Sequence, residues 1–239
     1  MAGPTHPATD ELPAGRRTGS ATRSGPAAFA DTQPRHSPTR MLEMSADDAP
    51  SRALAAADPE LGALIDRVGS IERGPYDTGF PVIARSIVAQ QLSEKVAPKI
   101  WARVVENVGI TPEALAAASP QELRDCGLSW RKVEYLQGIA RATLAGEIDW
   151  DGLGSLPDEE VIADLSRLRG VGRWTAEMYL IFALGRPDVL ALDDLGVRIS
   201  AGKMMGLGRA ATREELAERG ELWRPYRSTA SLWLWANGG

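Results

Sequence analysis

The sequence predicts an all-α protein, and three observations support this. From about Leu54 onward, apolar residues recur at i, i+3, i+4 and i+7, the spacing of one helix face. No sustained alternation of Val, Ile or Thr with polar residues indicates strands. At Thr111-Pro112 and Ser119-Pro120, a capping residue stands directly before a proline at the first helical position.

Each expected helix is bounded by signals of this kind. Ser119 with Glu122, and Thr212 with Glu215, also have the spacing of a capping box. Pro98 predicts a kink or a shorter helix in its segment. Helices are expected over 59–68, 79–91, 93–107, 112–118, 120–125, 130–145, 157–166, 173–184, 193–204, 212–222 and 226–236.

The chain divides into a tail and one folded domain. Residues 1–51 are rich in Pro, Ser, Thr, Gly and Ala and have no periodic apolar pattern, so they are predicted to be disordered. Residues 52–239 form the predicted domain, and a chain of 239 residues with 44% apolar residues can bury a substantial core. We expect this domain to be a monomer.

Composition excludes several classes of protein. The longest apolar run, Met178–Leu184, is far shorter than the roughly 20 residues of a membrane-spanning helix. With no apolar stretch typical of a secretory signal near Met1, we expect a soluble, cytoplasmic protein, associated with the nucleoid if bacterial. The single cysteine, Cys126, excludes an intramolecular disulfide and a cluster held by four thiolates.

The same composition narrows the chemistry. His6 and His36 both lie in the predicted tail, so catalysis has to use carboxylates, hydroxyls, lysine or arginine, and no metal site is expected. The net charge of -5 disfavours a broad basic face for nucleic acid but leaves a local one open.

The segment LRGVGRWTA, residues 168–176, is the most informative stretch. Gly170 and Gly172 allow a tight turn with positive φ and leave backbone N–H groups bare at the start of the next helix. Such a helix N-terminus, with Arg173 nearby, suits a phosphate. From Gly-x-Gly alone, a plain turn between two helices is the stronger interpretation.

The wider string resembles the helix-hairpin-helix motif of DNA glycosylases. The following GRPDVLALDDL, residues 185–195, resembles the Gly/Pro loop and aspartate that complete the superfamily signature. Segments ARSIVAQQLS (84–93), CGLSWRKVEYL (126–136) and WRPYRSTA (223–230) resemble the 3-methyladenine DNA glycosylase II family. The matches run in order over about residues 55–236. They imply a compact member without an extra N-terminal domain: a two-lobed helical bundle with its active site between the lobes.

The resemblance places the catalytic aspartate at Asp194, the second acid of the Asp-Asp pair. Asp193 is then better placed as the helix N-cap. Taken alone, the pair would indicate helix capping without chemistry.

Trp174 and Trp235 fall on family positions that line the pocket for the extruded base. Met178 stands where some members have an aromatic residue. The alternative for a tryptophan in an apolar helix is hydrophobic core. Seven tryptophans against three phenylalanines nevertheless suit stacking on an electron-deficient alkylated base.

Gln90, Gln91 and Leu92 lie where the family inserts a side chain into the gap left by the flipped nucleotide. Leu92 can act as an apolar wedge, or Gln91 can fill the gap and bind the orphaned base. An ordinary turn with Leu92 in the core is equally consistent, and the sequence does not decide between these readings.

DNA is expected to contact the hairpin, and the resemblance allows a structural monovalent cation on its carbonyls, with no other cofactor required. The predicted hairpin contacts are Gly170, Val171, Gly172, Arg173 and Thr175. Some basic side chains are weaker candidates for phosphate contacts, because most exposed basic residues are simply solvated. They are Lys95, Lys99, Arg131, Lys132, Arg224 and Arg227.

The sequence therefore predicts a monofunctional repair glycosylase that acts on double-stranded DNA containing alkylated purines such as 3-methyladenine and 7-methylguanine. Lyase-competent relatives have a lysine at the position of Trp174. The alternatives are a non-catalytic helix-hairpin-helix DNA-binding protein, a bifunctional glycosylase/lyase, and a glycosylase for another lesion.

Overall fold

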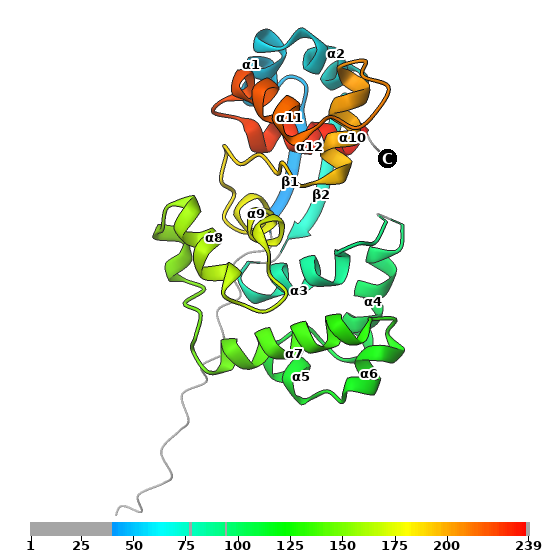
Figure 1. Cartoon of the computed structure of the whole chain (residues 1–239), viewed down its shortest axis with the longest axis vertical. Helices are drawn as coiled ribbons and strands as arrows, with labels where there is room; N and C mark the ends of the chain where they lie inside the picture. The colour runs from blue at the N-terminus through cyan, green and yellow to red at the C-terminus, as the bar shows by residue number, and fades with distance from the viewer. Residues whose placement is uncertain (1–39, 77, 94, 238–239) are drawn as a thin grey trace, which may run out of the picture. The chain divides into compact units, whose positions relative to one another are not determined.

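The computed structural model describes residues 40–76, 78–93 and 95–237, and this part of the chain is mostly helical (Figure 1). The predicted all-α class is confirmed. The helices are α1 (Ala49–Ala57), α2 (Pro59–Val68), α3 (Phe80–Ala89), α4 (Ala97–Asn107), α5 (Pro112–Ala117), α6 (Pro120–Asp125), α7 (Trp130–Leu144), α8 (Asp158–Ser166), α9 (Arg173–Phe182), α10 (Leu195–Met204), α11 (Arg213–Gly220) and α12 (Arg227–Asn237). The 3-10 helices are η1 (Gly152–Ser155) and η2 (Glu221–Trp223), and the strands are β1 (Arg40–Ser45) and β2 (Ser70–Tyr76).

The helices pack in two groups. One group, the middle lobe, contains α3 to α9, where α9 packs on both α3 and α8, and α7 packs on α3, α5 and α6. The other, the terminal lobe, contains α1, α2 and α10 to α12, where α12 packs on α1, α2 and α10. The loop 183–194 carries the chain from α9 in the middle lobe to α10 in the terminal lobe (Figure 1).

Residues 40–51, which were predicted to belong to the disordered tail, form strand β1 and the start of α1. Strand β1 pairs antiparallel with β2, and α1 begins at residue 49, so the prediction of disorder over residues 1–51 is wrong for residues 40–51. Met44 and Ile71 are opposite one another in the ladder and both are buried. Asp48 caps α1 by accepting a hydrogen bond from Ser51 N–H at 2.8 Å. Residues 1–39 lie outside the described residues.

Local signals placed most helices within a few residues. Both predicted capping boxes are present, on α6 and α11. Pro98 stands in the first turn of α4, which is the shorter helix predicted for that segment. Proline is tolerated there because the first N–H groups of a helix have no intrahelical acceptor.

Two tryptophans belong to the core of the terminal lobe. Trp223 donates its indole N–H to the buried Asp58 at 2.8 Å, and Trp233 donates to the Ser51 hydroxyl at 2.9 Å. Both rings are fully buried. The high tryptophan content is therefore partly explained by packing.

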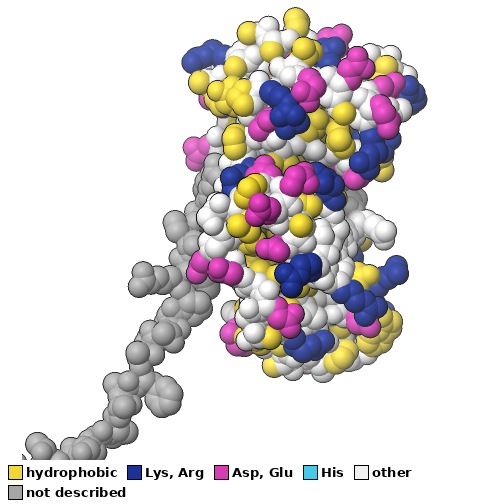
Figure 2. Space-filling model, turned by 60° about the vertical axis from the view of Figure 1, so that its left-hand side comes forward, with side chains coloured by type: hydrophobic (Ala, Val, Ile, Leu, Met, Phe, Trp, Pro, Cys, Tyr) yellow, Lys and Arg dark blue, Asp and Glu magenta, His cyan; other side chains and the backbone are white. Residues whose placement is uncertain are grey.

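On the face shown in Figure 2, basic and acidic side chains are interspersed, so this face presents no broad basic surface. Within the described residues, no helix combines the length and the apolar character needed to cross a membrane.

Candidate active site

Asp194 stands where the loop 183–194 enters α10. Its Oδ1 accepts a hydrogen bond from the Val197 N–H at 2.8 Å, so Asp194 is the N-cap of this helix. The prediction that Asp193 is the cap is wrong, because the helix begins at Leu195. Asp193 is exposed and pairs instead with Arg213.

Two tryptophans from different helices direct their indole N–H groups at the Asp194 carboxylate. Trp174 Nε1 on α9 donates to Oδ2 at 2.8 Å, and Trp235 Nε1 on α12 donates to Oδ1 at 2.9 Å. With the cap bond, three N–H donors hold a carboxylate whose residue is only 9% exposed. Hydrogen bonds to a charged acceptor are strong and directional, so this carboxylate has a fixed orientation. The structure thus brings together Asp194, Trp174 and Trp235.

A stripe along α9 extends this cluster. Trp174, Met178 and Phe182 lie at i, i+4 and i+8, so they share one side of the helix. The Phe182 ring stacks on Trp235, with centroids 5.8 Å apart and an interplanar angle of 26°. Met178, between them on the stripe, is buried. Phe182 is absent from the predicted site, although its spacing from Trp174 is a signal that could have found it.

The hairpin before α9 requires glycine. Gly170 has a φ of +94°, and a Cβ at this position would lie 2.3 Å from the Tyr135 ring on α7. Both the backbone conformation and the close approach therefore exclude a side chain. Val171 is buried, and Gly172 is the N-cap of α9 without a side chain to bind the first-turn N–H groups. These N–H groups remain available to an anion, as predicted for a helix N-terminus.

The turn of residues 90–92, which follows α3, is attached to this hairpin. The Gln90 side-chain Nε2 donates to the Gly170 carbonyl at 2.9 Å and to the Thr175 hydroxyl at 3.1 Å. Gln91 is exposed and has a φ of +57°, a left-handed conformation that costs a non-glycine residue about 1–2 kcal/mol. Leu92 is half-buried and packs against the core.

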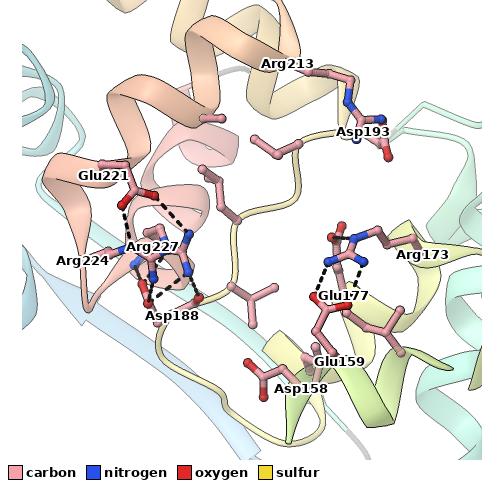
Figure 3. Close-up of a pocket in the computed structure, with 16 residues that line it drawn as sticks. Asp158, Glu159, Arg173, Glu177, Asp188, Asp193, Arg213, Glu221, Arg224 and Arg227 are labelled. Carbon is pink, nitrogen blue, oxygen red and sulfur yellow. Dashed lines mark hydrogen bonds and ion pairs between the residues drawn. The ribbon is translucent and has the colours of Figure 1, made fainter. Parts of the chain in front are cut away.

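Arg173, predicted to contact DNA, is occupied by two carboxylates (Figure 3). It donates to both oxygens of Glu159, at 3.0 and 2.5 Å, and to Oε1 of Glu177 at 3.0 Å. Glu177 is buried, and its Oε2 has no hydrogen-bond partner within the described residues. Burial raises the pKa of Glu177 to about 7, although Arg173 opposes this rise.

These residues line a cavity of about 360 Å³ that is distinct from the Asp194 cluster (Figure 3). Across it, Asp188 of the loop 183–194 pairs with Arg227 and Arg224, each at 2.7 Å. Arg224 also binds Glu221 at 2.8 Å. Arg224 and Arg227 therefore hold the loop 183–194, which leads to Asp194, in place. These ion pairs argue against the predicted role of the two arginines as phosphate ligands.

Of the other basic candidates, Lys132 also has a structural role. Its Nζ donates to the carbonyls of Val88 and Gln90, each at 2.7 Å, and burial lowers its pKa. Lys95, Lys99 and Arg131 are exposed.

The predicted hairpin cation would need oxygen ligands, and the hairpin supplies backbone carbonyls. The described residues contain no group of three or more His, Cys, Asp and Glu side chains that could hold a metal ion. Backbone carbonyls would therefore have to hold it. The Gly170 carbonyl accepts from Gln90 at 2.9 Å and the Leu168 carbonyl from the Val171 N–H at 3.0 Å, which leaves each a second lone pair. The cation stays a prediction.

The glycine hairpin of residues 167–172 joins α8 to α9, and this arrangement defines a helix-hairpin-helix protein. Residues 84–225 match the family described as HhH-GPD superfamily base excision DNA repair protein. The chain belongs to this family.

Named relatives and solved structures are consistent with this. The chain is 35% identical to DNA-3-methyladenine glycosylase 1 of Schizosaccharomyces pombe over 169 residues, covering 69% of this chain and 72% of that protein. A solved complex of the S. pombe 3-methyladenine DNA glycosylase Mag1 with abasic DNA has a TM-score of 0.73 and 32% identity, covering 79% of this chain and 95% of that one. A DNA-3-methyladenine glycosidase from Bacillus halodurans has a TM-score of 0.68 and 34% identity, covering 83% and 93%.

Proposed function

We propose that this chain is a monofunctional DNA glycosylase that removes alkylated purines, such as 3-methyladenine and 7-methylguanine, from duplex DNA. The observation that carries the proposal is the Asp194 carboxylate, buried and held by the indole N–H groups of Trp174 and Trp235. The names of the relatives, and the abasic DNA bound to one of them, support the reaction class.

The cluster provides what this reaction requires. A base has to leave the stack before its glycosidic bond can be reached, and aromatic faces then receive it. Alkylation of a ring nitrogen makes the base cationic, which favours contact with electron-rich indole rings and makes the base a good leaving group without an acid.

The remaining task is to stabilise positive charge on the sugar as the bond breaks. A fixed carboxylate does this without reorganising during the reaction. Oδ2 of Asp194 accepts one hydrogen bond, from Trp174, so a lone pair remains for the sugar or for the attacking water.

Gln91 is the better of the two wedge candidates. It is exposed at the tip of the 90–92 turn in a strained conformation, whereas Leu92 packs against the core. Strained backbone of this kind concentrates at functional positions. An inserted glutamine fills the gap of the flipped nucleotide and binds the unpaired base opposite.

The hairpin would bind a backbone phosphate through amides rather than through the Arg173 side chain, which Glu159 and Glu177 already occupy. The first-turn N–H groups of α9 supply the donors. Duplex DNA is the partner on this proposal, bound by a monomer.

The experiment is release of free base. Duplexes carrying 3-methyladenine, 7-methylguanine, hypoxanthine or ethenoadenine are incubated with the protein, and the liberated base is quantified by chromatography. Release of the methylated purines supports the proposal, and release of only another base shifts it to a different lesion. DNA binding without release from any duplex would establish a non-catalytic protein.

A further inference from the structure

The amide of Gln90 joins segments far apart in the sequence. Its two N–H donors are both used, one on the Gly170 carbonyl at 2.9 Å and one on the Thr175 hydroxyl at 3.1 Å. Gly170 belongs to the hairpin, and Thr175 to the first turn of α9, directly after Trp174. One side chain therefore ties the end of α3 to the phosphate-binding hairpin and to the helix that carries the pocket.

The backbone of Gln90 is fixed from a third direction. Lys132 on α7 donates to its carbonyl and to that of Val88, each at 2.7 Å. Gln91 follows at a φ of +57°, which a residue with a side chain rarely adopts unless its surroundings impose it. Gln91 itself is exposed, so its conformation depends on the residues on either side: the Leu92 N–H donates to the Ala89 carbonyl at 3.1 Å, and Gln90 makes the bonds described above.

We propose that Gln90 is a positioning residue for base excision, whose side-chain amide holds Gln91 in a fixed relation to the hairpin and to Trp174. This rests on the proposed function, since it requires Gln91 to enter the DNA. With the Gln90 amide in place, the hairpin that binds the phosphate and the Gln91 side chain that enters the DNA duplex keep a fixed relative position. Without the Gln90 amide, the 90–92 turn has to be ordered each time the protein binds DNA, which costs conformational entropy.

The test is a Gln90→Met variant, which keeps the length of the side chain and removes both N–H donors. Base flipping is followed by the fluorescence of 2-aminopurine placed beside a 7-methylguanine, and excision by single-turnover base release. We expect both rates to fall about tenfold, the size of effect that two lost hydrogen bonds give. The affinity for undamaged duplex should stay within about twofold of wild type.

The decisive measurement is a double-mutant cycle with Gln91→Ala. If Gln90 acts through Gln91, then Gln90→Met has no further effect once Gln91 is alanine, so the double variant equals Gln91→Ala alone. Independent, multiplying losses would show that Gln90 only supports the fold and would overturn the proposal. An unaltered rate for Gln90→Met would overturn it as well.

Two further results distinguish a failure of the positioning role of Gln90 from a failure of the proposed glycosylase function. Wild-type rates for Gln91→Ala would reject the wedge and the positioning role while leaving glycosylase activity intact. A wild-type protein that releases no base would reject the glycosylase function itself.

If thermal unfolding shows that Gln90→Met does not fold, Thr175→Val is the substitute variant, because it removes one hydrogen-bond acceptor of Gln90 and preserves the shape of the side chain. Its smaller loss should also disappear when Gln91 is alanine, and persistence of that loss would overturn the proposal.

Discussion

The indole nitrogen of Trp174 lies 2.8 Å from Oδ2 of Asp194. By the resemblance described in the sequence analysis, this position, directly after the Gly-x-Gly-x turn, is the one that a lysine occupies in lyase-competent glycosylases. A lysine amine there forms a Schiff base with the sugar, whereas an indole N–H has no nucleophilic lone pair. In this chain the residue at that position donates a hydrogen bond to the Asp194 carboxylate.

The first prediction is that the product is an intact abasic strand. Borohydride added during the reaction should trap no covalent protein–DNA adduct, because no amine occupies the position of Trp174. A bifunctional glycosylase run in parallel is the positive control. Efficient trapping with this chain would reassign it to the bifunctional class.

The second prediction separates the two adjacent acids. In Asp194→Asn the carbonyl oxygen can still cap α10, but the NH₂ group faces an indole N–H and the negative charge is lost. We expect single-turnover excision of 7-methylguanine to fall by about 10²–10³, the effect of removing a preorganised electrostatic group. DNA affinity should survive or rise, because a carboxylate near the phosphates has been neutralised.

Asp193→Asn is the matched control. It removes the exposed pairing with Arg213, and such surface pairs contribute about 0–1 kcal/mol. Its excision rate should therefore stay close to that of wild type. If Asp193→Asn were the inactive variant, the catalytic assignment within the pair would be wrong, and if neither variant were slow, the mechanism would have to be abandoned.

The third prediction compares two truncations. Removal of residues 1–39 should leave excision within a few-fold of wild type, because no residue of the proposed site lies among them. Removal of residues 1–51 also takes β1, the buried Met44 and the Ser51 hydroxyl that accepts from Trp233. We expect it to cost about 2–5 kcal/mol of unfolding free energy, measured in urea. Equal stability of the two truncations would show that β1 adds nothing.

Local signals explain why most of the fold could be predicted. The capping box at Ser119 and the proline at residue 98 act within a few residues of sequence. The sheet is different: its pairing of Met44 with Ile71 is non-local, and the short strands carry little alternation. Helix α1 was not predicted, because its alanine-rich sequence follows a segment rich in Pro, Ser, Thr, Gly and Ala and resembles it in composition.

The candidate site likewise contains residues that the sequence predicted and contacts that it did not. Asp194, Trp174 and Trp235 were predicted through the resemblance to the glycosylase family, and the structure places them together. The partners of Gln90 stand 80 and 85 residues away, and nothing in the sequence couples them. The cap was misplaced by one residue because either acid of an Asp-Asp pair satisfies the capping preference, and only the position of Val197 N–H decides between them.

The last prediction concerns pH and Glu177. Burial is the main cause that raises its pKa from 4.5 to about 7, with Asp193 and Glu159 adding to the rise and Arg173 opposing it. Between these two values the folded chain holds the proton more tightly than the unfolded chain. The contribution of Glu177 to the free energy of unfolding therefore falls as pH rises from about 4.5 to 7 and stays low above that.

Glu177→Gln keeps the shape of the side chain and removes the titration. The variant should match wild type at pH 5 and be more stable at pH 8, by on the order of 1–3 kcal/mol, in urea unfolding at the two pH values. Glu159→Gln is the control with the opposite sign. The hydrogen bond from Arg173 lowers the pKa of Glu159, so the ionised Glu159 stabilises the fold at neutral pH. The variant should lose that contribution and be less stable than wild type at pH 8. A Glu177→Gln variant less stable than wild type at pH 8 would contradict this prediction, because it would mean that the attraction between the ionised Glu177 and Arg173 outweighs the cost of burying the charge.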